Sequence, residues 1–142
     1  MNVNYLSDKN KNKEVKKPQQ VAKIFQEILN SSDEFDQDKE MFWVLGLTSR
    51  KTIKFIELVS IGTIDASLVH PRETFRPAIV KAVPSVIFSH NHPSGSVEPS
   101  AEDIETTKRL VKAGKLLGID VNDHIIISKN KHCSMRSEGL II

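Results

Sequence analysis

The fold is organised around residues 90–103, HNHPSGSVEPSAED, in which two histidines stand one residue apart ahead of a loop rich in proline, glycine and serine. The preceding residues 84–89, PSVIFS, are mostly apolar and include β-branched and aromatic side chains, which predicts a strand buried on both faces. Side chains two positions apart on a strand share a face, and a proline at 93 favours extended backbone in the residue before it. We therefore expect His90 and His92 to point the same way at the end of this strand.

A helix is predicted to begin just after Ser100. Ser100 and Asp103 have the spacing of a capping box, and this structural explanation predicts no chemistry. With about 3.6 residues per turn, however, Asp103 falls on the apolar side of the helix. That side is shared with Ile104, Leu110, Val111, Gly114, Leu117 and Gly118. Because burial of an unpaired carboxylate is costly, we expect Asp103 to have a cationic partner.

His90, His92 and Asp103 together suggest a metal site. Two imidazoles and a carboxylate are ligands that zinc accepts, and three protein ligands leave a fourth position for water, as in catalytic sites. Closed structural sites usually take four protein ligands, often cysteines, and the sequence has a single cysteine, Cys133. The composition of the site therefore favours a hydrolytic zinc centre, with one ion per chain, over a zinc finger.

The spacing His90-x-His92, seven residues, Ser100, two residues, Asp103 resembles the JAMM signature of the JAB/MPN metalloprotease superfamily. The strings SHNHPSG, PSAED and DHIII resemble its RadC branch, and the likeness extends upstream to Gly62–Thr63 and His70–Glu73. The resemblance implies an α/β fold of the JAB/MPN type. This fold is a cytidine-deaminase-like α-β-α sandwich, in which helices flank a mixed β-sheet.

The resemblance also assigns roles to residues. It implies that His90, His92 and Asp103 bind zinc, and that Ser100 stabilises the oxyanion of a tetrahedral intermediate. It further implies a glutamate general base at the start of an earlier strand, and Glu40, ahead of the apolar run MFWVLGL, matches that placement. Three other glutamates remain alternatives on composition alone: Glu34, Glu57 and Glu73.

The activity that the resemblance implies is zinc-dependent hydrolysis of a peptide or isopeptide amide, as in a metallopeptidase. Two alternatives stay open, a DNA-repair-associated protein that acts on or near DNA and a non-catalytic JAB/MPN scaffold. Full-length RadC-like proteins carry an N-terminal helix-hairpin-helix region, and this sequence shows only a lysine-rich stretch and one helix before the fold. The net charge of +2 is too small to demand a nucleic-acid partner, so the sequence does not support direct DNA binding, and DNA stays open as a partner. The sequence leaves the identity of the amide and the oligomeric state open.

The first 17 residues are polar and rich in lysine, and we expect a flexible tail ahead of a single domain at 18–142. No apolar run has the length of a signal-peptide core or a membrane span. A lone cysteine agrees with a reducing compartment, so we expect a cytoplasmic protein that has no membrane partner.

Apolar spacing predicts the remaining elements. These are a helix from Pro18, a hairpin of residues 41–47 and 53–61, a short strand at 66–69, a helix opened by Pro71 and interrupted or limited by Pro77, and strands at 119–128 and 133–136. His124 is interpreted as a core histidine with a satisfied ring, and the alternative is a partner that orients a metal ligand. His70 and His132 receive no functional role.

Overall fold

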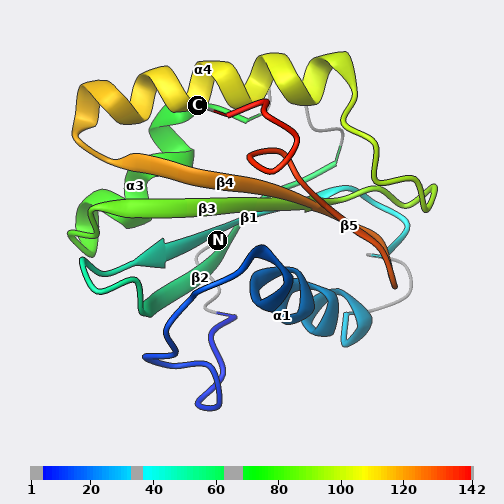
Figure 1. Ribbon diagram of the computed structural model, residues 1–142, viewed down its shortest axis with the longest axis horizontal. Helices are drawn as coiled ribbons and strands as arrows, with labels where there is room; N and C mark the ends of the chain where they lie inside the picture. The colour runs from blue at the N-terminus through cyan, green and yellow to red at the C-terminus, as the bar shows by residue number, and fades with distance from the viewer. Residues whose placement is uncertain (1–4, 33–36, 63–68, 142) are drawn as a thin grey trace.

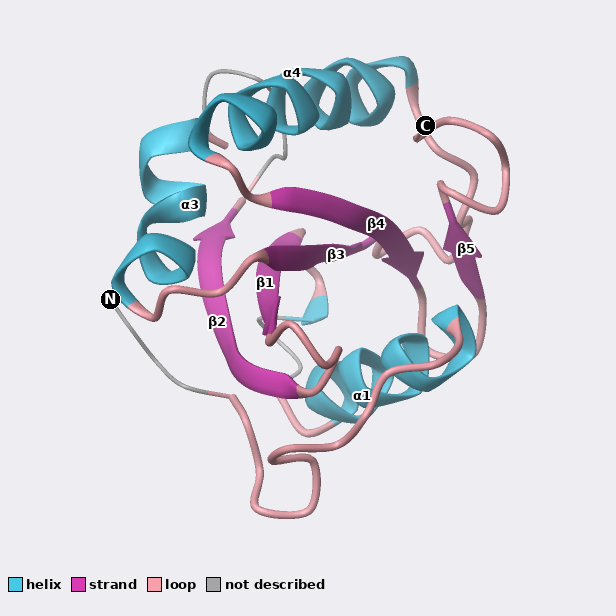
Figure 2. Cartoon of the chain, turned by 60° about the vertical axis from the view of Figure 1, so that its left-hand side comes forward, coloured by secondary structure: helices cyan, strands magenta, loops and turns pink. Residues whose placement is uncertain are grey.

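The computed structural model describes residues 5–32, 37–62 and 69–141. Within these ranges, one five-stranded mixed sheet lies between helices on both of its faces (Figure 1; Figure 2). The elements are α1 (Pro18–Asn30), β1 (Met41–Leu47), β2 (Ile53–Ile61), α3 (Pro71–Val80), β3 (Ser85–Asn91), α4 (Ala101–Leu117), β4 (Asp120–Ile127) and β5 (His132–Ser134). This architecture confirms the predicted α/β fold class and the predicted order of elements.

The strands are ordered β2-β1-β3-β4-β5 across the sheet. β1 is antiparallel to β2 and β3, β3 is parallel to β4, and β4 is antiparallel to β5. The parallel pair requires a crossover connection, which α4 supplies. As a result, the carboxyl ends of β3 and β4 lie at the same end of the sheet as the start of β1, where Phe42 pairs with His90.

Each face of the sheet is covered by its own layer of helices. α1 packs on one face against β3, β4 and β5, whereas α3 and α4 lie on the other (Figure 1). Alternate side chains of β1 serve the two layers: Trp43 and Leu45 belong to the core cluster under α1, and Phe42 and Val44 to the cluster under α3 and α4. A strand covered on both faces has no solvent side, which explains why all of MFWVLGL is buried.

The prediction that Pro77 interrupts its helix or limits the first turn is wrong. α3 begins at Pro71 as predicted but continues through Pro77 to Val80, and Pro77 itself is buried. A proline inside a helix removes one hydrogen bond to the carbonyl four residues earlier. Here that carbonyl belongs to Glu73, an exposed residue, so water can take the place of the missing donor.

The predicted core position of Leu117 at the end of α4 is also wrong. Leu117 is 49% exposed, whereas Ile119 is 5% exposed. Gly118 ends the helix in the left-handed conformation, with φ 73°, and Ile119 N donates to Gly114 O at 2.8 Å. This tight turn sends Ile119 back onto the core beside Gly114, where it takes the place predicted for Leu117.

Other predicted boundaries shift slightly. The strand expected at 66–69 falls outside the described residues except for Val69, which is buried. The strand expected at 133–136 is β5, one residue earlier at its start and two at its end. His70 is the N-cap of α3, where its Nδ1 accepts from Arg72 N at 3.2 Å.

Residues 5–17 lie along the β1–β2 hairpin. Tyr5 N donates to Ile56 O at 2.8 Å, Val15 N to Lys51 O at 2.8 Å, and Ile53 N to Lys13 O at 2.9 Å. The predicted flexibility of this stretch and the predicted domain boundary at residue 18 stay predictions.

None of the helices in the described part of the chain combines the length and the apolar character needed to span a bilayer.

Candidate metal centre

β3 and the residue that follows it carry the two histidines. His90 is the penultimate residue of β3 and is fully buried, and His92 N donates to Ile127 O at 3.0 Å, so the chain keeps its pairing with β4 beyond the strand end. The Nδ1 atom of His92 lies 2.8 Å from Ser96 O. Because a carbonyl only accepts, this nitrogen carries the hydrogen of the neutral ring, and the Nε2 atom is left as an acceptor.

α4 carries the carboxylate. Ser100 is the N-cap of this helix: its Oγ accepts from Asp103 N at 3.0 Å, and its own N donates to Asp103 Oδ2 at 2.9 Å. The capping box is therefore present, and Asp103 is at the same time buried, at 3% exposure. Capping and inward orientation do not exclude each other, because Oδ2 accepts from Ser100 N and also faces His92, while Oδ1 faces His90.

Three side chains converge to a small triangle of potential ligand atoms. His90 Nε2 and His92 Nε2 are 3.0 Å apart, His92 Nε2 and Asp103 Oδ2 are 3.0 Å apart, and His90 Nε2 and Asp103 Oδ1 are 3.2 Å apart. A tetrahedral zinc with bonds of about 2.0–2.1 Å separates its ligand atoms by about 3.3 Å. The three residues can therefore hold a metal ion with little rearrangement. The structure brings together the three residues that the sequence singled out, and binding of a metal by them stays a prediction.

The charges of this group suit a cation. Burial alone would raise the pKa of the Asp103 carboxyl, but hydrogen bonds that His90 and His92 donate when their Nε2 atoms carry hydrogens outweigh burial and hold the pKa well below its usual range. The hydrogen bond with Asp103 raises the pKa of His92 above its ordinary value, against the opposing effect of burial. The carboxylate is therefore ionised, and a cation bound between the three side chains would take the place of the hydrogens on the two Nε2 atoms.

Glu40 lies just before the neighbouring strand, close enough to His92 for its charge to act on that ring. It immediately precedes β1, two residues before Phe42, and Phe42 pairs with His90, two residues before His92. Glu40 is half-buried, and its negative charge contributes to the raised pKa of His92. Of the alternatives, Glu57 pairs with Val44 further along β1, Glu73 is exposed next to Arg72 on α3, and Glu34 lies outside the described residues.

Asn91 bonds to the backbone on both sides of Glu40, a role that was not predicted from the sequence. Its Oδ1 accepts from Met41 N at 2.6 Å, and its Nδ2 donates to Lys39 O at 2.9 Å. Asn91 is 1% exposed. The residue between the two histidines thus ties the end of β3 to the segment that carries Glu40.

His124 contacts a candidate ligand directly. Its Nε2 atom lies 2.7 Å from His90 Nδ1, and its Nδ1 atom lies 2.6 Å from Thr107 Oγ1. Burial lowers the pKa of His124 well below its ordinary value, and the charge of His90 lowers it further. The interpretation as a buried histidine with a satisfied ring is right, and the structure adds that one of the partners is His90. The role of Thr107 was not predicted from the sequence, because it depends on the packing of α4 against β4.

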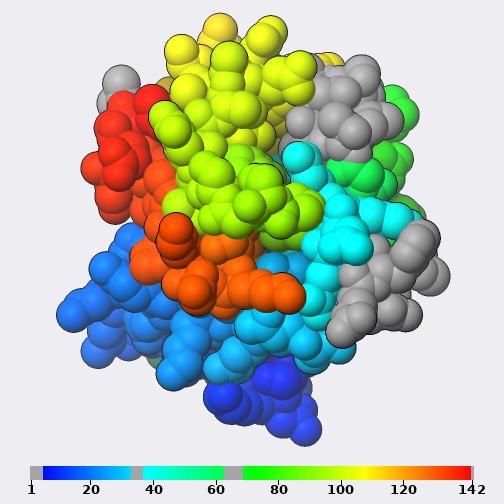
Figure 3. Space-filling view, turned by 90° about the vertical axis from the view of Figure 1, so that its right-hand side faces the viewer, coloured from blue at the N-terminus to red at the C-terminus, as the bar shows by residue number. Residues whose placement is uncertain are grey.

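The centre lies at the end of the sheet shown in Figure 3, where the β3–α4 loop, the β4–β5 turn and the segment before β1 meet. A hollow of about 430 Å³ at this end is lined by Leu29, Gln37, Asn91, His92, Pro93, Gly95, Ser128, Lys129 and Asn130. His92 is the candidate ligand that reaches this hollow, and its side chain is 13% exposed.

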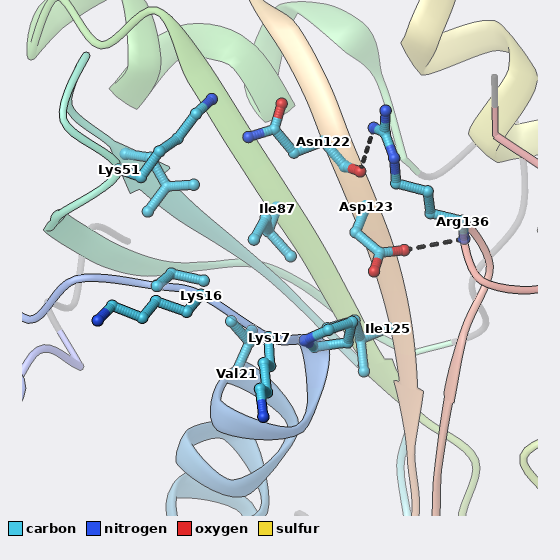
Figure 4. A pocket seen from close by; sticks show the side chains of 12 residues that line it. Lys16, Lys17, Val21, Lys51, Ile87, Asn122, Asp123, Ile125 and Arg136 are labelled. Atoms are coloured by element: carbon cyan, nitrogen blue, oxygen red, sulfur yellow. Dashed lines mark hydrogen bonds between the residues drawn. The ribbon is translucent and has the colours of Figure 1, made fainter.

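A second hollow, of about 360 Å³, lies at the opposite end of the sheet (Figure 4). Lys16, Lys17 and Lys51 line it, but their ammonium groups point in different directions. Its carboxylate, Asp123, is used internally: it accepts from His124 N at 2.7 Å, from Arg136 N at 3.0 Å and from the hydroxyl of Ser134. These bonds anchor β4 to the segment after β5 and fix the backbone at His124.

Comparison with known proteins places the chain in a family. The family model described as the RadC-like JAB domain matches residues 15–140. A UPF0758 protein of Desulforamulus reducens is 52% identical over 106 residues, which cover 75% of this chain and 47% of that protein. A UPF0758 protein of Alkaliphilus oremlandii is 43% identical over 136 residues, which cover 96% of this chain and 56% of that protein. The chain spans about half the length of the curated relatives it matches, and it belongs to the RadC-like JAB domain family.

Proposed function

We propose that this chain is a zinc-dependent hydrolase that cleaves an amide bond in a peptide or isopeptide substrate. The observation that carries the proposal is the triangle of His90, His92 and Asp103, whose potential ligand atoms lie 3.0–3.2 Å apart beside Glu40. Membership of the JAB domain family, whose superfamily includes metallopeptidases, supports the same reaction class.

Each residue has a distinct role in this proposal. Zinc, when bound by His90, His92 and Asp103, supplies Lewis-acid activation of water and of the amide carbonyl. Glu40 accepts a proton from the attacking water and passes it to the leaving amine. Ser100 accepts the Asp103 N–H, so its own hydroxyl hydrogen remains available to donate to the carbonyl oxygen as negative charge develops there.

Metal analysis combined with a cleavage assay tests the proposal. The chain is stripped of metal, reloaded with zinc chloride and incubated with a panel of peptides and isopeptides, with and without the chelator 1,10-phenanthroline. We expect one zinc per chain, cleavage of at least one member of the panel, loss of cleavage with chelator and recovery with added zinc. A His90→Ala variant that still binds zinc stoichiometrically and cleaves would contradict the assignment of the site.

Two other outcomes would favour the alternatives. Stoichiometric zinc without cleavage of any substrate would support a scaffold. Binding of duplex DNA with a steep dependence on salt would support a role on DNA, because such a dependence is the signature of contacts to phosphates.

A further inference from the structure

A chain of three buried hydrogen bonds joins one candidate ligand to the backbone of another. His90 Nδ1 lies 2.7 Å from His124 Nε2, His124 Nδ1 lies 2.6 Å from Thr107 Oγ1, and Thr107 Oγ1 donates to Asp103 O at 2.7 Å. The four residues are between 0% and 3% exposed. This series of hydrogen bonds therefore begins on β3, crosses β4 and ends on α4, out of contact with solvent.

Which atom donates in each of these hydrogen bonds follows from the last acceptor, the backbone carbonyl of Asp103, because a carbonyl cannot donate. Asp103 O is a carbonyl, so Thr107 donates its single hydroxyl hydrogen there and must accept from His124 Nδ1–H. A neutral His124 with its hydrogen on Nδ1 has an acceptor at Nε2, and this acceptor takes the hydrogen of His90 Nδ1. His90 is then left with a lone pair on Nε2, the atom that faces His92 and Asp103.

The opposite direction is incompatible with metal binding through this atom. If His124 donated from Nε2, His90 Nδ1 would have to accept, and a neutral His90 ring would carry its hydrogen on Nε2. A protonated Nε2 has no lone pair to offer a cation.

We infer that His124 and Thr107 are positioning residues that hold His90 in the tautomer with Nδ1–H and so present its Nε2 lone pair to the metal. This inference rests on the proposed zinc centre and adds two residues to it, one from β4 and one from α4. Because the same hydroxyl bonds to the Asp103 carbonyl, Thr107 also couples the orientation of His90 to the first turn of α4.

Burial gives the inference a measurable consequence. His90 and His124 are fully buried, so water cannot readily replace a lost partner, and an unpaired N–H is costly there. Loss of such a hydrogen-bond partner behind a metal-ligating histidine typically reduces metal affinity about 10- to 100-fold. We expect Thr107→Val and His124→Leu each to weaken zinc binding by about this factor.

α4 supplies a matched control. Thr106 is the neighbouring residue, is equally buried at 1% exposure, and its Oγ1 has no hydrogen-bond partner among the described residues. Thr106→Val makes the same chemical change as Thr107→Val without breaking the chain of hydrogen bonds. We expect Thr106→Val to leave zinc affinity unchanged. Thr107→Ser retains a hydroxyl and His124→Gln retains an acceptor, so the zinc affinity of each should stay within about threefold of that of the unsubstituted protein.

The experiment measures zinc affinity by competition with a chromophoric chelator, after circular dichroism has established that each variant is folded. Long-range ¹H–¹⁵N NMR spectra of the zinc-loaded chain then identify the nitrogen of His90 that carries hydrogen, and we expect Nδ1.

The inference is overturned if Thr107→Val binds zinc no more weakly than Thr106→Val, or if the hydrogen of His90 is on Nε2. Should His124→Leu fail to fold, the two threonine variants still decide. Zinc binding by the unchanged chain with no effect of Thr107→Val would refute this inference alone, and no zinc binding by the unchanged chain would refute the proposed function with it.

Discussion

The two sides of the candidate site are held in different ways. On the metal side, His90 and Asp103 are buried and joined through His124 and Thr107 inside the core. On the other side, Glu40 is half-buried just before β1, and the backbone on either side of it is held by the side chain of Asn91. The geometry of the metal side is thus a property of the packed sheet and helix, whereas that of Glu40 depends on hydrogen bonds to its backbone segment, from the Asn91 side chain and from Gly62 N, which donates to Glu40 O at 2.8 Å. Metal binding and catalysis should therefore be separable by mutation.

The largest expected effect is on the metal side. Asp103→Asn removes the charge that balances a cation and should weaken zinc binding by more than about a hundredfold, with loss of cleavage. This estimate takes a four-ligand zinc site as worth about 10–16 kcal/mol, or roughly 3 kcal/mol per ligand. Metal titration of the variant measures it. Glu102→Gln, at the adjacent exposed position of α4, is the matched control and should bind zinc normally.

The next effect should appear in catalysis without a change in metal binding. Glu40→Gln removes the proposed base and should lower the rate of amide cleavage by about 10²- to 10⁴-fold. Its zinc affinity should stay within about twofold, because Glu40 is not part of the ligand triangle. The measurement is kcat alongside the zinc titration, and Glu73→Gln on α3 serves as control. Equal losses of zinc affinity and rate would show that the two sides are not independent.

Ser100 belongs to both sides, because it caps α4 and is the proposed donor to the carbonyl oxygen. Ser100→Ala should lower the free energy of unfolding by about 0.5–2 kcal/mol through loss of the cap. It should also lower kcat by about a hundredfold if the hydroxyl stabilises the oxyanion. An aspartate at this position can cap the helix but, when ionised, cannot donate a hydrogen bond. Compared with Ser100→Ala, Ser100→Asp should therefore recover the free energy of unfolding but not kcat. Recovery of both would assign Ser100 a capping role alone.

The sequence predicted the metal side because local periodicity encodes it. Alternation along β3 aligns His90 with His92, and helical phase turns Asp103 inward, so three residues could be named without a tertiary structure. Asn91 and Thr107 could not be found in this way. The role of Asn91 depends on β3 lying antiparallel to β1, and that of Thr107 depends on α4 packing against β4. Neither pairing is visible in a local pattern.

The errors in the fold have a similar origin. Leu117 has the helical phase of a core residue, but the left-handed turn at Gly118 gives its place to Ile119. Pro77 is a local signal for a helix break, yet the tertiary packing of α3 keeps the helix intact around it. A local turn at the helix end thus overrides the helical phase of Leu117, and the burial of Pro77 in the core accompanies a helix that continues through it.

The smallest effect should come from the amide that holds the Glu40 segment. Asn91→Ala leaves the buried Met41 N–H without its acceptor, which costs about 1–3 kcal/mol of stability, and removes the side-chain bonds on both sides of Glu40, while Gly62 N still donates to Glu40 O. Because small displacements of a catalytic group are costly, we expect kcat to fall about tenfold. Zinc affinity should not change, since the side chain of Asn91 bonds to the segment before β1 and not to the histidines. Asn130→Ala, at an exposed position lining the same hollow, controls for changes to the hollow itself. A parallel loss of zinc affinity in Asn91→Ala would mean that the start of β1 also supports the metal side, and the division of the site into two independently held halves would have to be abandoned.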